Sequence, residues 1–438
     1  MLVYLLNHST APVNLGGAER SMLRLVEDWY ASDPEFEAVF ITKAPRGRFI
    51  DALEDRGWSY RAFRYRGWAG PAPLSARERQ YFARDDYAAT LGIIQMMEDR
   101  RPDLVITNTV VAPWAAFAAA VVGVPHAWFI REYGDLDHGL TFQNGRAATF
   151  ADVGLLSQAV FTNSVALKEH IGQYLDAGTV TVVYPHVDVD AIAARAAEPP
   201  SRAPFPEHDH GLRLVVVGRL SEGKGQWRVV EALGELHARG ILASLCLVGS
   251  DETIGTEASL LARAAELGVA DRLRLVGEQE NPYPFIAAAD VGITPSTVEA
   301  FGRSTLEYMA MGKAVIATRN GGSTELVESG VTGVLFDPDD QASLVEAIAR
   351  YAEAPELSAA HGRAGQARAV TLARENGNAA AIERLRETAT ARPYRLPAVA
   401  RSWFELPGRA SPDGGVLTVI ARRLPGRLRT ALRRVVRR

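Results

Sequence analysis

The chain has 438 residues, a formal net charge of −4 and a single cysteine, Cys246. This length exceeds what one hydrophobic core supports and suits two domains with a connecting segment. A single cysteine excludes a disulfide framework and a zinc site built from cysteines, and the apolar run around Cys246 predicts a buried side chain. The first residues lack the basic start of a secretory signal, so we expect a cytoplasmic protein.

Strand-like and helix-like segments alternate through the first half of the chain. Short apolar runs predict strands at residues 2–7, 37–42, 103–108, 126–130, 158–164 and 179–185. Amphipathic spacing predicts helices at residues 19–29, 49–56, 87–100 and 165–175. Residues 67–86 look like a long loop or short helices at a functional edge. The alternation predicts a parallel sheet with right-handed crossovers.

One apolar stretch, residues 110–130, is long enough to cross a membrane. It is broken by Pro113, Gly123 and Pro125, and it follows a strand-like run. We therefore interpret it as a buried helix, a turn and a strand, with His126 as a core histidine.

The pattern restarts after residues 199–210, which we interpret as a linker. Further strands are predicted at residues 212–220, 242–250, 273–278, 290–296 and 314–318, and helices at 226–239, 258–267 and 341–352. The fold class is therefore α/β, with two doubly wound, Rossmann-like domains. We expect an N-terminal domain at residues 1–198, a C-terminal domain at 211–385 and a basic tail at 386–438.

A glycine-rich loop follows the first strand of the C-terminal domain. Arg219 and Lys224 flank Gly218, Gly223 and Gly225 just before a predicted helix. Glycines let the backbone approach a ligand closely, and a helix start attracts anions. Arginine can fork onto phosphate oxygens while lysine supplies a point charge. The chain holds only four lysines beside 44 arginines, and one of the four is Lys224.

Two carboxylates follow the strand predicted at residues 290–296. Glu299 falls on the loop after the strand, and Glu307 falls in the opening turns of the next helix, for which Ser304 and Thr305 offer N-caps. In open α/β sheets, ligands bind at this edge. Two carboxylates suit ligand hydroxyls, while the N–H groups of the helix start suit phosphate.

At these residues the chain resembles retaining glycosyltransferases of the GT-B fold, specifically the large GT4 family. The hallmark of that family is a Glu-x7-Glu signature, preceded by serine and containing Phe-Gly. Here the signature consists of Ser296, Glu299, Phe301, Gly302 and Glu307. The resemblance implies two Rossmann-like domains facing a cleft, with an acceptor-side N-terminal domain and a C-terminal domain that binds the nucleotide sugar.

The resemblance also implies roles for single residues. Arg219 and Lys224 would hold the diphosphate of the donor and stabilise it as it leaves. Glu307 would bind the ribose hydroxyls, and Glu299 would bind a hydroxyl of the donor sugar. Backbone N–H groups of the segment that includes Phe301, Gly302, Arg303 and Ser304 would add contacts to sugar and phosphate.

Two further segments of the N-terminal domain resemble the family less closely. Gly16 and Gly17 resemble its Gly-Gly-Ala-Glu turn, which faces the donor phosphates and the acceptor. Many relatives carry a histidine near the start of the loop at residues 129–139. This chain has Arg131 and Glu132 there, with His138 further on. Arg131 either holds a phosphate or an acidic sugar, or forms a structural ion pair with Glu132, and both interpretations stay open.

Asp135 and Asp137 fit an Asp-x-Asp pattern, as do Asp188 and Asp190. Two such carboxylates can bind Mg²⁺ or Mn²⁺ on a diphosphate. The tripeptide is common by chance, however, and the cations of the glycine-rich loop would make a metal redundant. We expect no metal and no cofactor, with the nucleoside-diphosphate sugar as co-substrate.

The C-terminal tail carries most of the excess positive charge. From Arg392 onward, twelve arginines stand against Glu405 and Asp413, which leaves the rest of the chain near −14. Apolar residues recur every three or four positions among these arginines, an amphipathic pattern interrupted at Pro425. Such helices lie on anionic membranes, which predicts a peripheral position at the inner membrane face. A helix packed on the acidic body and a disordered arm are the alternatives. Nucleic-acid binding would need more than a basic terminus.

The resemblance thus implies a retaining glycosyltransferase that moves a sugar from a nucleoside-diphosphate sugar to the hydroxyl of a carbohydrate or lipid-linked acceptor. Family analogy places this reaction in bacterial cell-surface polysaccharide or glycolipid biosynthesis. A non-catalytic GT-B scaffold or sugar-nucleotide-binding protein is one alternative, and a sugar-nucleotide epimerase on the same fold is another. The intact set of cations and glutamates argues against the scaffold, and an epimerase would lack the signature.

Overall fold

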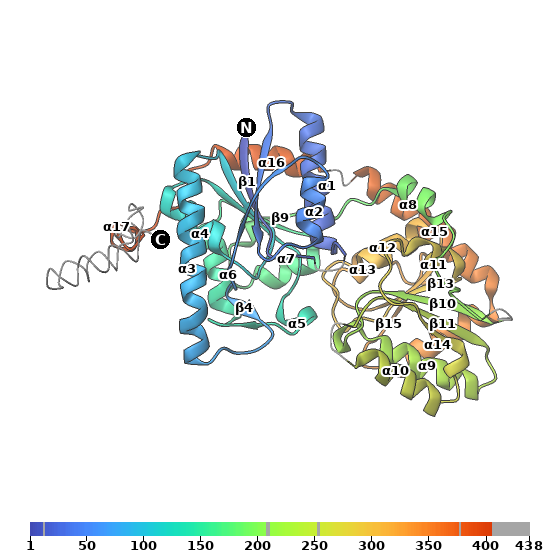
Figure 1. The fold of residues 1–438 in the computed structure, drawn as a ribbon. Helices are drawn as coiled ribbons and strands as arrows, with labels where there is room; N and C mark the ends of the chain where they lie inside the picture. Colours follow the sequence, from blue (N-terminus) through green and yellow to red (C-terminus); the bar gives the residue numbers. More distant parts are fainter. Residues whose placement is uncertain (12–13, 207–210, 252–254, 376–377, 405–438) are drawn as a thin grey trace, which may run out of the picture.

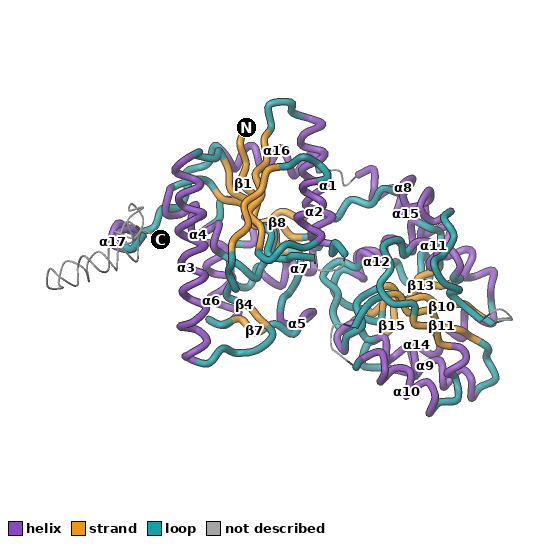
Figure 2. The backbone as a smooth tube through the Cα atoms, viewed as in Figure 1, coloured by secondary structure: helices purple, strands orange, loops and turns teal. Residues whose placement is uncertain are grey.

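The computed structural model describes residues 1–438 apart from 12–13, 207–210, 252–254, 376–377 and 405–438. Two parallel sheets with helices packed around them form two domains (Figures 1 and 2). Alternate side chains of a strand point to opposite faces, so a sheet buried on both faces needs apolar residues throughout. The apolar runs of the sequence meet this requirement, and the predicted doubly wound α/β class is confirmed.

In the N-terminal domain, the strand order is β3-β2-β1-β5-β6-β8-β9, and every neighbouring pair is parallel. The strands are β1 (Leu2–Leu6), β2 (Glu37–Lys43), β3 (Ser59–Phe63), β5 (Leu104–Thr107), β6 (His126–Ile130), β8 (Ala159–Thr162) and β9 (Val180–Val182). Strand β1 pairs with β2 on one side and with β5 on the other, so the strand order reverses at this point. Such a reversal opens a crevice beyond the carboxyl ends of the strands, where ligands bind.

The helices of this domain are α1 (Gly17–Ser32), α2 (Arg48–Glu54), α3 (Ala76–Asp99), α4 (Trp114–Val122), α5 (Asp135–His138), α6 (Arg146–Leu156) and α7 (Val165–Ile171). Two short strands, β4 (Ala69–Gly70) and β7 (Thr141–Phe142), pair antiparallel. Helix α1 buries Met22, Val26 and Trp29 against the sheet, as its apolar spacing requires.

In the C-terminal domain, the strand order is β12-β11-β10-β13-β14-β15, again with parallel pairs. The strands are β10 (Leu212–Val217), β11 (Ala243–Val248), β12 (Leu273–Leu275), β13 (Val291–Thr294), β14 (Ala314–Thr318) and β15 (Val334–Phe336). The helices are α8 (Val189–Ala196), α9 (Gln226–Ala238), α10 (Thr256–Glu266), α11 (Tyr283–Ala288), α12 (Arg303–Ala310), α13 (Ser323–Leu326), α14 (Gln341–Glu353) and α15 (Pro355–Glu375).

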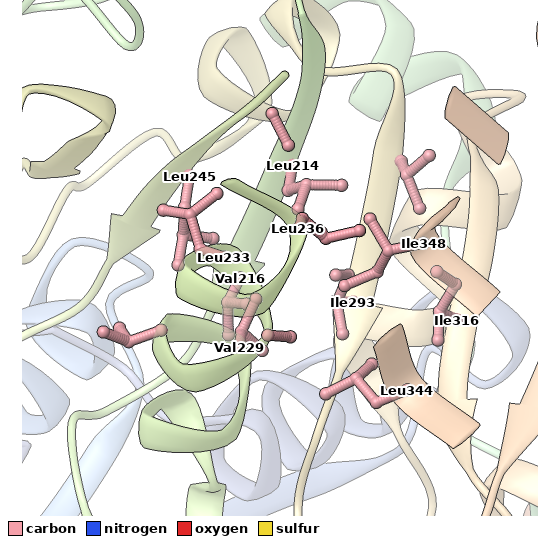
Figure 3. Packing of buried hydrophobic residues seen from close by; sticks show 14 of the residues in the cluster. Leu214, Val216, Val229, Leu233, Leu236, Leu245, Ile293, Ile316, Leu344 and Ile348 are labelled. Carbon is pink, nitrogen blue, oxygen red and sulfur yellow. The ribbon is translucent and has the colours of Figure 1, made fainter. Parts of the chain in front are cut away.

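The core of the C-terminal domain has two layers, one on each face of its sheet. Leu214 and Val216 of β10 pack with α9 and α14 on one face (Figure 3). Val215, between them in sequence, packs on the other face with residues of α11 and α12. Cys246 lies on this second face and is fully buried, as predicted, and burial raises the pKa of its thiol to about 12. It therefore stays protonated at neutral pH.

Over the residues that the structure describes, the chain crosses between the domains twice. Helix α8 precedes the expected boundary at residue 198, but its Ile192 lies in the core of the C-terminal domain. After α15 the chain returns, and α16 (Ala379–Ala389) packs beside α1 on the N-terminal domain (Figure 1). Ile382 and Leu385 of α16 enter the core of that domain. The expected start of the tail at residue 386 therefore falls inside a packed helix, because the apolar stripe of α16 is buried by a domain far away in sequence.

The segment after α16 also packs on the N-terminal domain. The Leu396 N–H donates to the carbonyl of Ala120, at 3.1 Å. Phe404 is buried, and its ring lies 5.7 Å from that of Tyr87 and 5.4 Å from that of Phe117. Between them runs the short helix α17 (Ala398–Ser402). The amphipathic pattern of the tail, from residue 417 onward, lies outside the described residues.

Two local predictions were wrong. Residues 67–86 hold the first turns of α3, which begins at residue 76 because Ser75 and Glu78 form a capping box. Helix α12 is capped by Gly302, with φ of 93°, rather than by Ser304 or Thr305. The Thr305 hydroxyl instead bonds that of Thr294, at 2.7 Å in the interior.

The apolar stretch at residues 110–130 forms the nine-residue helix α4, a turn at Gly123 and strand β6, as predicted. His126 is fully buried between the hydroxyls of Thr107 and Ser157, at 2.9 and 3.0 Å, which confirms a core histidine. None of the helices in the described ranges combines the length and apolar character that crossing a membrane requires.

Candidate functional site

Lys224 and Glu299 meet at the carboxyl edge of the second sheet. Lys224 ends the short 3₁₀ turn η2 (Glu222–Lys224) after β10, and Glu299 lies on the loop after β13. The Lys224 Nζ and Glu299 Oε2 atoms are 2.9 Å apart, and the Ser296 hydroxyl donates to the same oxygen at 2.9 Å. Because β10 and β13 are neighbouring parallel strands, residues 75 apart in sequence share one edge.

The charge state of Glu299 follows from these contacts. Burial acts to raise its pKa, but the charge of Lys224 and the hydrogen bonds from Lys224 and Ser296 outweigh burial. The pKa of Glu299 therefore lies below its usual range, and the side chain is a carboxylate at neutral pH. It presents a fixed hydrogen-bond acceptor beside a cation.

Helix α12 begins with backbone N–H groups directed at the same edge. Gly302 adopts a left-handed conformation that turns the chain into the helix, and the first turn leaves N–H groups at Arg303 and Ser304 without intrahelical partners. The Phe301 side chain points into the core, with its ring 5.7 Å from that of Tyr184. Of residues 301–304, Phe301 and Gly302 thus shape the turn, while the helix start supplies donors for an anion.

Glu307 is buried one turn further along α12. Its Oε1 atom accepts from Arg303 Nε at 3.1 Å and from the Tyr283 hydroxyl at 3.3 Å. These two donors hold the carboxylate in place. Glu307 and Glu299 are therefore anchored by different partners.

The Gly16-Gly17 turn faces this helix start from the other domain. Gly16 caps α1, and a side-chain carbon added to Gly17 would lie 3.6 Å from the Cδ atom of Arg303. The same addition at Gly16 would lie 2.6 Å from Glu19 Oε2, closer than atoms pack. The Gly17 position is therefore at ordinary contact distance from Arg303 of the other domain, while the crowding at Gly16 comes from Glu19 of α1, the helix that Gly16 caps.

Arg131 and Glu132 follow β6, and each has its own partner. The Arg131 Nε atom donates to Asn108 Oδ1 at 2.7 Å, while Glu132 Oε1 accepts from the Val110 N–H at 3.1 Å. Burial lowers the pKa of Arg131 to about 10, and the nearby charge of Arg303 acts in the same direction. The guanidinium nevertheless stays charged at neutral pH.

Glu132 is the more strongly perturbed of the two. Burial raises its pKa to about 7, and the carboxylates of Asp137 and Glu19 add to that effect. The hydrogen bond from Val110 and the charge of Arg131 oppose it without cancelling it. A carboxyl group that titrates near neutral pH beside a domain interface fits a functional position.

His138 and Arg219 meet across the interface. The Nδ1 atom of His138, at the end of α5, lies 3.1 Å from a terminal nitrogen of Arg219. A side-chain carbon added to Gly223 would lie 3.6 Å from the backbone oxygen of Asp137. The loop after β6 and the glycine-rich loop after β10 are thus adjacent, although they belong to different domains.

The two Asp-x-Asp segments have internal roles. Asp135 pairs with Arg146, and Asp137 accepts from the N–H groups of Tyr133 and Gly134 at 2.9 and 2.8 Å. Asp188 caps α8. Over the described residues, no group of three or more His, Cys, Asp or Glu side chains is arranged to hold a metal ion.

Known families match almost the whole of this two-domain framework. Residues 15–191 match the family described as "Glycosyltransferase Family 4", and residues 199–368 match "Glycosyl transferases group 1". The chain belongs to the GT4-type glycosyltransferases. The fold expected from the resemblance, GT-B, is confirmed.

The relatives of this GT4 chain include bacterial glycosyltransferases named for lipopolysaccharide core biosynthesis. It is 26% identical over 307 residues to the lipopolysaccharide core biosynthesis glycosyltransferase LpsE of Rhizobium meliloti, covering 68% of this chain and 82% of LpsE. It is 35% identical over 195 residues to a GDP-mannose-dependent phosphatidylinositol monomannoside mannosyltransferase of Mycolicibacterium smegmatis, covering 42% of this chain and 49% of that enzyme. The match to the R. meliloti glycosyltransferase LpsD, at 29% identity, covers 43% of this chain and 57% of LpsD.

Solved structures share the fold of the GT4 chain. Anabaena HepE, in complex with UDP and glucose, superposes with a TM-score of 0.67 at 22% sequence identity. The alignment covers 89% of this chain and 99% of HepE.

Several residues of the site in the GT4 chain were not predicted from the sequence. Three strands of the first sheet, β1, β5 and β8, are each followed directly by an asparagine: Asn7, Asn108 and Asn163. Asn108 accepts from Arg131, and Asn163 donates to the Arg131 carbonyl at 2.9 Å. An asparagine directly after an apolar run was the signal that could have found all three. Tyr283, which holds Glu307, had no such signal.

Proposed function

We propose that the chain transfers a sugar from a nucleoside-diphosphate sugar to an acceptor hydroxyl with retention of the anomeric configuration. The observation that carries this proposal is the contact between Lys224 and Glu299 beside the start of α12. A cation, a carboxylate and free N–H groups at one sheet edge match the diphosphate and hydroxyl groups of such a donor.

The chemistry follows from the charges. When the glycosidic bond breaks, negative charge builds on the leaving diphosphate, and Arg219 and Lys224 would stabilise it. Glu299 would hold a hydroxyl of the donor sugar, and Glu307 would hold the ribose. Both carboxylates would bind hydroxyls and would not form a pair flanking the scissile bond, so we assign no nucleophile.

We propose a carbohydrate or lipid-linked acceptor of the bacterial cell surface. Support comes from LpsE and LpsD, which are named for lipopolysaccharide core biosynthesis, and from the mannosyltransferase of phosphatidylinositol monomannoside. The basic tail would hold the cytoplasmic enzyme at the inner membrane face.

A thermal-shift screen with UDP, GDP and dTDP sugars tests the donor, because a bound ligand raises the melting temperature by mass action. We expect one nucleotide to stabilise the protein, and nucleoside diphosphate to be released only when acceptor is added. The variant Lys224→Ala should stay folded and lose roughly 10²- to 10³-fold in turnover, the scale of one preorganised charge contact. Lys168→Ala on α7 is the control.

The outcomes separate the candidate functions. Turnover of Lys224→Ala equal to that of the unchanged chain would refute the phosphate assignment. Nucleotide binding without turnover on any acceptor would favour a scaffold. Activity should also survive EDTA, since two basic side chains replace a metal. Loss of activity on chelation, with recovery when Mn²⁺ is added, would refute this metal independence.

A further inference from the structure

A second group of polar side chains lies at the carboxyl edge of the first sheet. Asn7 and His8 follow β1, Lys43 is the last residue of β2, and Arg66 follows β3. Parallel strands bring their carboxyl ends to the same edge, which also holds Arg131 after β6. The group borders the point where the strand order reverses, between β1 and β5.

Lys43 and Arg66 are held by aromatic rings. The Lys43 Nζ atom lies 6.0 Å from the centre of the Tyr65 ring, and the guanidinium carbon of Arg66 lies 4.3 Å from that of Phe82. Neither cation forms an ion pair with a carboxylate of the described residues. The rings therefore orient the two charges without neutralising them.

Asp86, the carboxylate whose charge acts on Lys43, accepts hydrogen bonds from backbone groups. Its Oδ1 atom accepts from the backbone N–H groups of Arg66 at 2.6 Å and Gly67 at 3.3 Å, which fixes the loop after β3. Burial and the like charge of Arg66 both lower the pKa of Lys43, against a smaller opposite effect of Asp86. Two partly buried cations that repel one another would be relieved by an anion bound between them.

Polar atoms of Asn7 and His8 lie between Lys43 and the residues proposed to bind the donor. The buried Oδ1 atom of Asn7 and the Nδ1 atom of His8 have no hydrogen-bond partner among the described residues. Burial lowers the pKa of His8 to about 3, so the ring is neutral, and the charges of Lys43 and His138 act on it from nearby. His138 in turn contacts Arg219. A ligand along this edge would meet Lys43, then His8, then the diphosphate cations.

We propose that Lys43 and Arg66 bind an anionic group of the acceptor, a phosphate or a carboxylate, at the carboxyl edge of the first sheet. This inference rests on the proposed sugar transfer, because it places the acceptor opposite the donor cations. It narrows the acceptor class to phosphorylated or acidic carbohydrates, including those carried on lipid phosphate.

The test measures binding of three probes to the full chain, which is first saturated with the nucleoside diphosphate that stabilises it most. Saturation occupies the donor phosphate site. The probes are glucose 6-phosphate, glucuronate and neutral methyl glucoside, titrated calorimetrically. The variants are Lys43→Met and Arg66→Gln, and the matched control is Arg64→Gln, an exposed arginine two positions before Arg66.

We expect at least one anionic probe to bind the unchanged chain and Arg64→Gln, and to bind either variant roughly 10- to 100-fold more weakly, the scale of one lost charged hydrogen bond. The two anionic probes distinguish a phosphate from a carboxylate.

Unchanged affinity in both variants, equal binding of methyl glucoside, or no binding of either anion would overturn the inference. Failure of every nucleotide to bind would instead refute the proposed function. Melting temperatures without ligand show whether each variant is folded, and Arg66→Lys, which keeps the charge, should restore affinity.

Discussion

At the scale of single residues, the two signature glutamates are held by different partners. Glu299 faces Lys224 and Ser296, whereas Glu307 is fixed by Arg303 and Tyr283. Glu299 therefore shares its surroundings with Lys224, which we propose binds the donor diphosphate, while Glu307 is held by residues of α11 and α12. The same substitution at the two positions should have different effects.

We expect Glu307→Gln to weaken binding of free nucleoside diphosphate about tenfold, because the proposed ribose contact is part of that ligand. Glu299→Gln should spare nucleotide affinity and lower turnover about 10- to 100-fold, because its proposed ligand is the sugar. Titration of both variants with nucleoside diphosphate, next to turnover assays, measures the difference. Equal losses of affinity would contradict the assignment, and Glu328→Gln, at an exposed position, is the control.

Glu132 should make the stability of the protein depend on pH. Its folded pKa of about 7 lies above the value of an unfolded glutamate, so the folded state keeps a proton that the unfolded state has lost. The free energy of unfolding should therefore fall as pH rises between about 4.5 and 7, by roughly 2–3 kcal/mol relative to Glu132→Gln. The glutamine can still accept the hydrogen bond from Val110.

Urea denaturation at about pH 5 and about pH 8 measures this difference, because a lost proton appears as a change in stability. The free energy of unfolding of Glu132→Gln, minus that of the unchanged chain, should be larger at the higher pH. A difference that stays constant would show that Glu132 titrates normally.

At the scale of elements, the carboxylate of Glu325 joins the two domains. It lies in α13 of the C-terminal domain, yet it accepts from the N–H groups of Val165 and Ala166 at the start of α7, at 3.0 and 2.8 Å. It also accepts from the Tyr184 hydroxyl at 2.7 Å. A carboxylate at a helix start satisfies free N–H groups and complements the helix dipole.

We expect Glu325→Ala to lower the free energy of unfolding by about 1–3 kcal/mol, because two helix N–H groups and one hydroxyl lose their partner. Hydrogen exchange at Val165 and Ala166 should become faster, since these amides are released. Glu328→Ala, three positions along the same segment, provides the matched control. Unchanged exchange at both amides would show that the contact is not maintained in solution.

The elements also show what a sequence can and cannot predict. Strands β1, β10 and β11 were predictable because each is a short apolar run, and a parallel sheet buried on both faces requires such runs. The cap of α12 was not, because Ser304 is a good N-cap in isolation while the left-handed turn at Gly302 depends on the packing around it. The position of α16 depends on packing against α1, which lies near the other end of the chain.

The candidate site also has residues that the sequence predicts and contacts that it does not. The glycine-rich loop and the Glu-x7-Glu spacing mark Lys224 and Glu299 separately. Their contact follows only from the adjacency of β10 and β13, which no local pattern encodes. Glu325 carries no local signal, since its partners are backbone groups of the other domain.

At the scale of the whole molecule, the arginine-rich segment should act as a membrane anchor. Trp403 and Val399, just before it, are 64% and 75% exposed, which adds apolar surface next to the charge. Deleting residues 405–438 should reduce sedimentation with anionic vesicles and leave turnover on a soluble acceptor nearly unchanged. Binding of the intact protein should weaken as salt rises, because exposed charges are screened.

The cut must follow Phe404, because the residues before it pack on the N-terminal domain. Vesicles of neutral lipid serve as the control for charge. Equal sedimentation of the full and shortened chains would refute the anchor, and a shortened chain that unfolds would show that the segment packs on the body.

We expect the two connections between the domains to limit how the domains can move. One lies between β9 and α8, and the other lies between α15 and α16. Rotation about an axis through both connections changes either one little, whereas sliding the domains apart would stretch both. If one connection were cleaved by a protease, the two domains would still be linked through the other connection. Entry of the donor and access of the acceptor would then depend on the angle between the two domains about this axis.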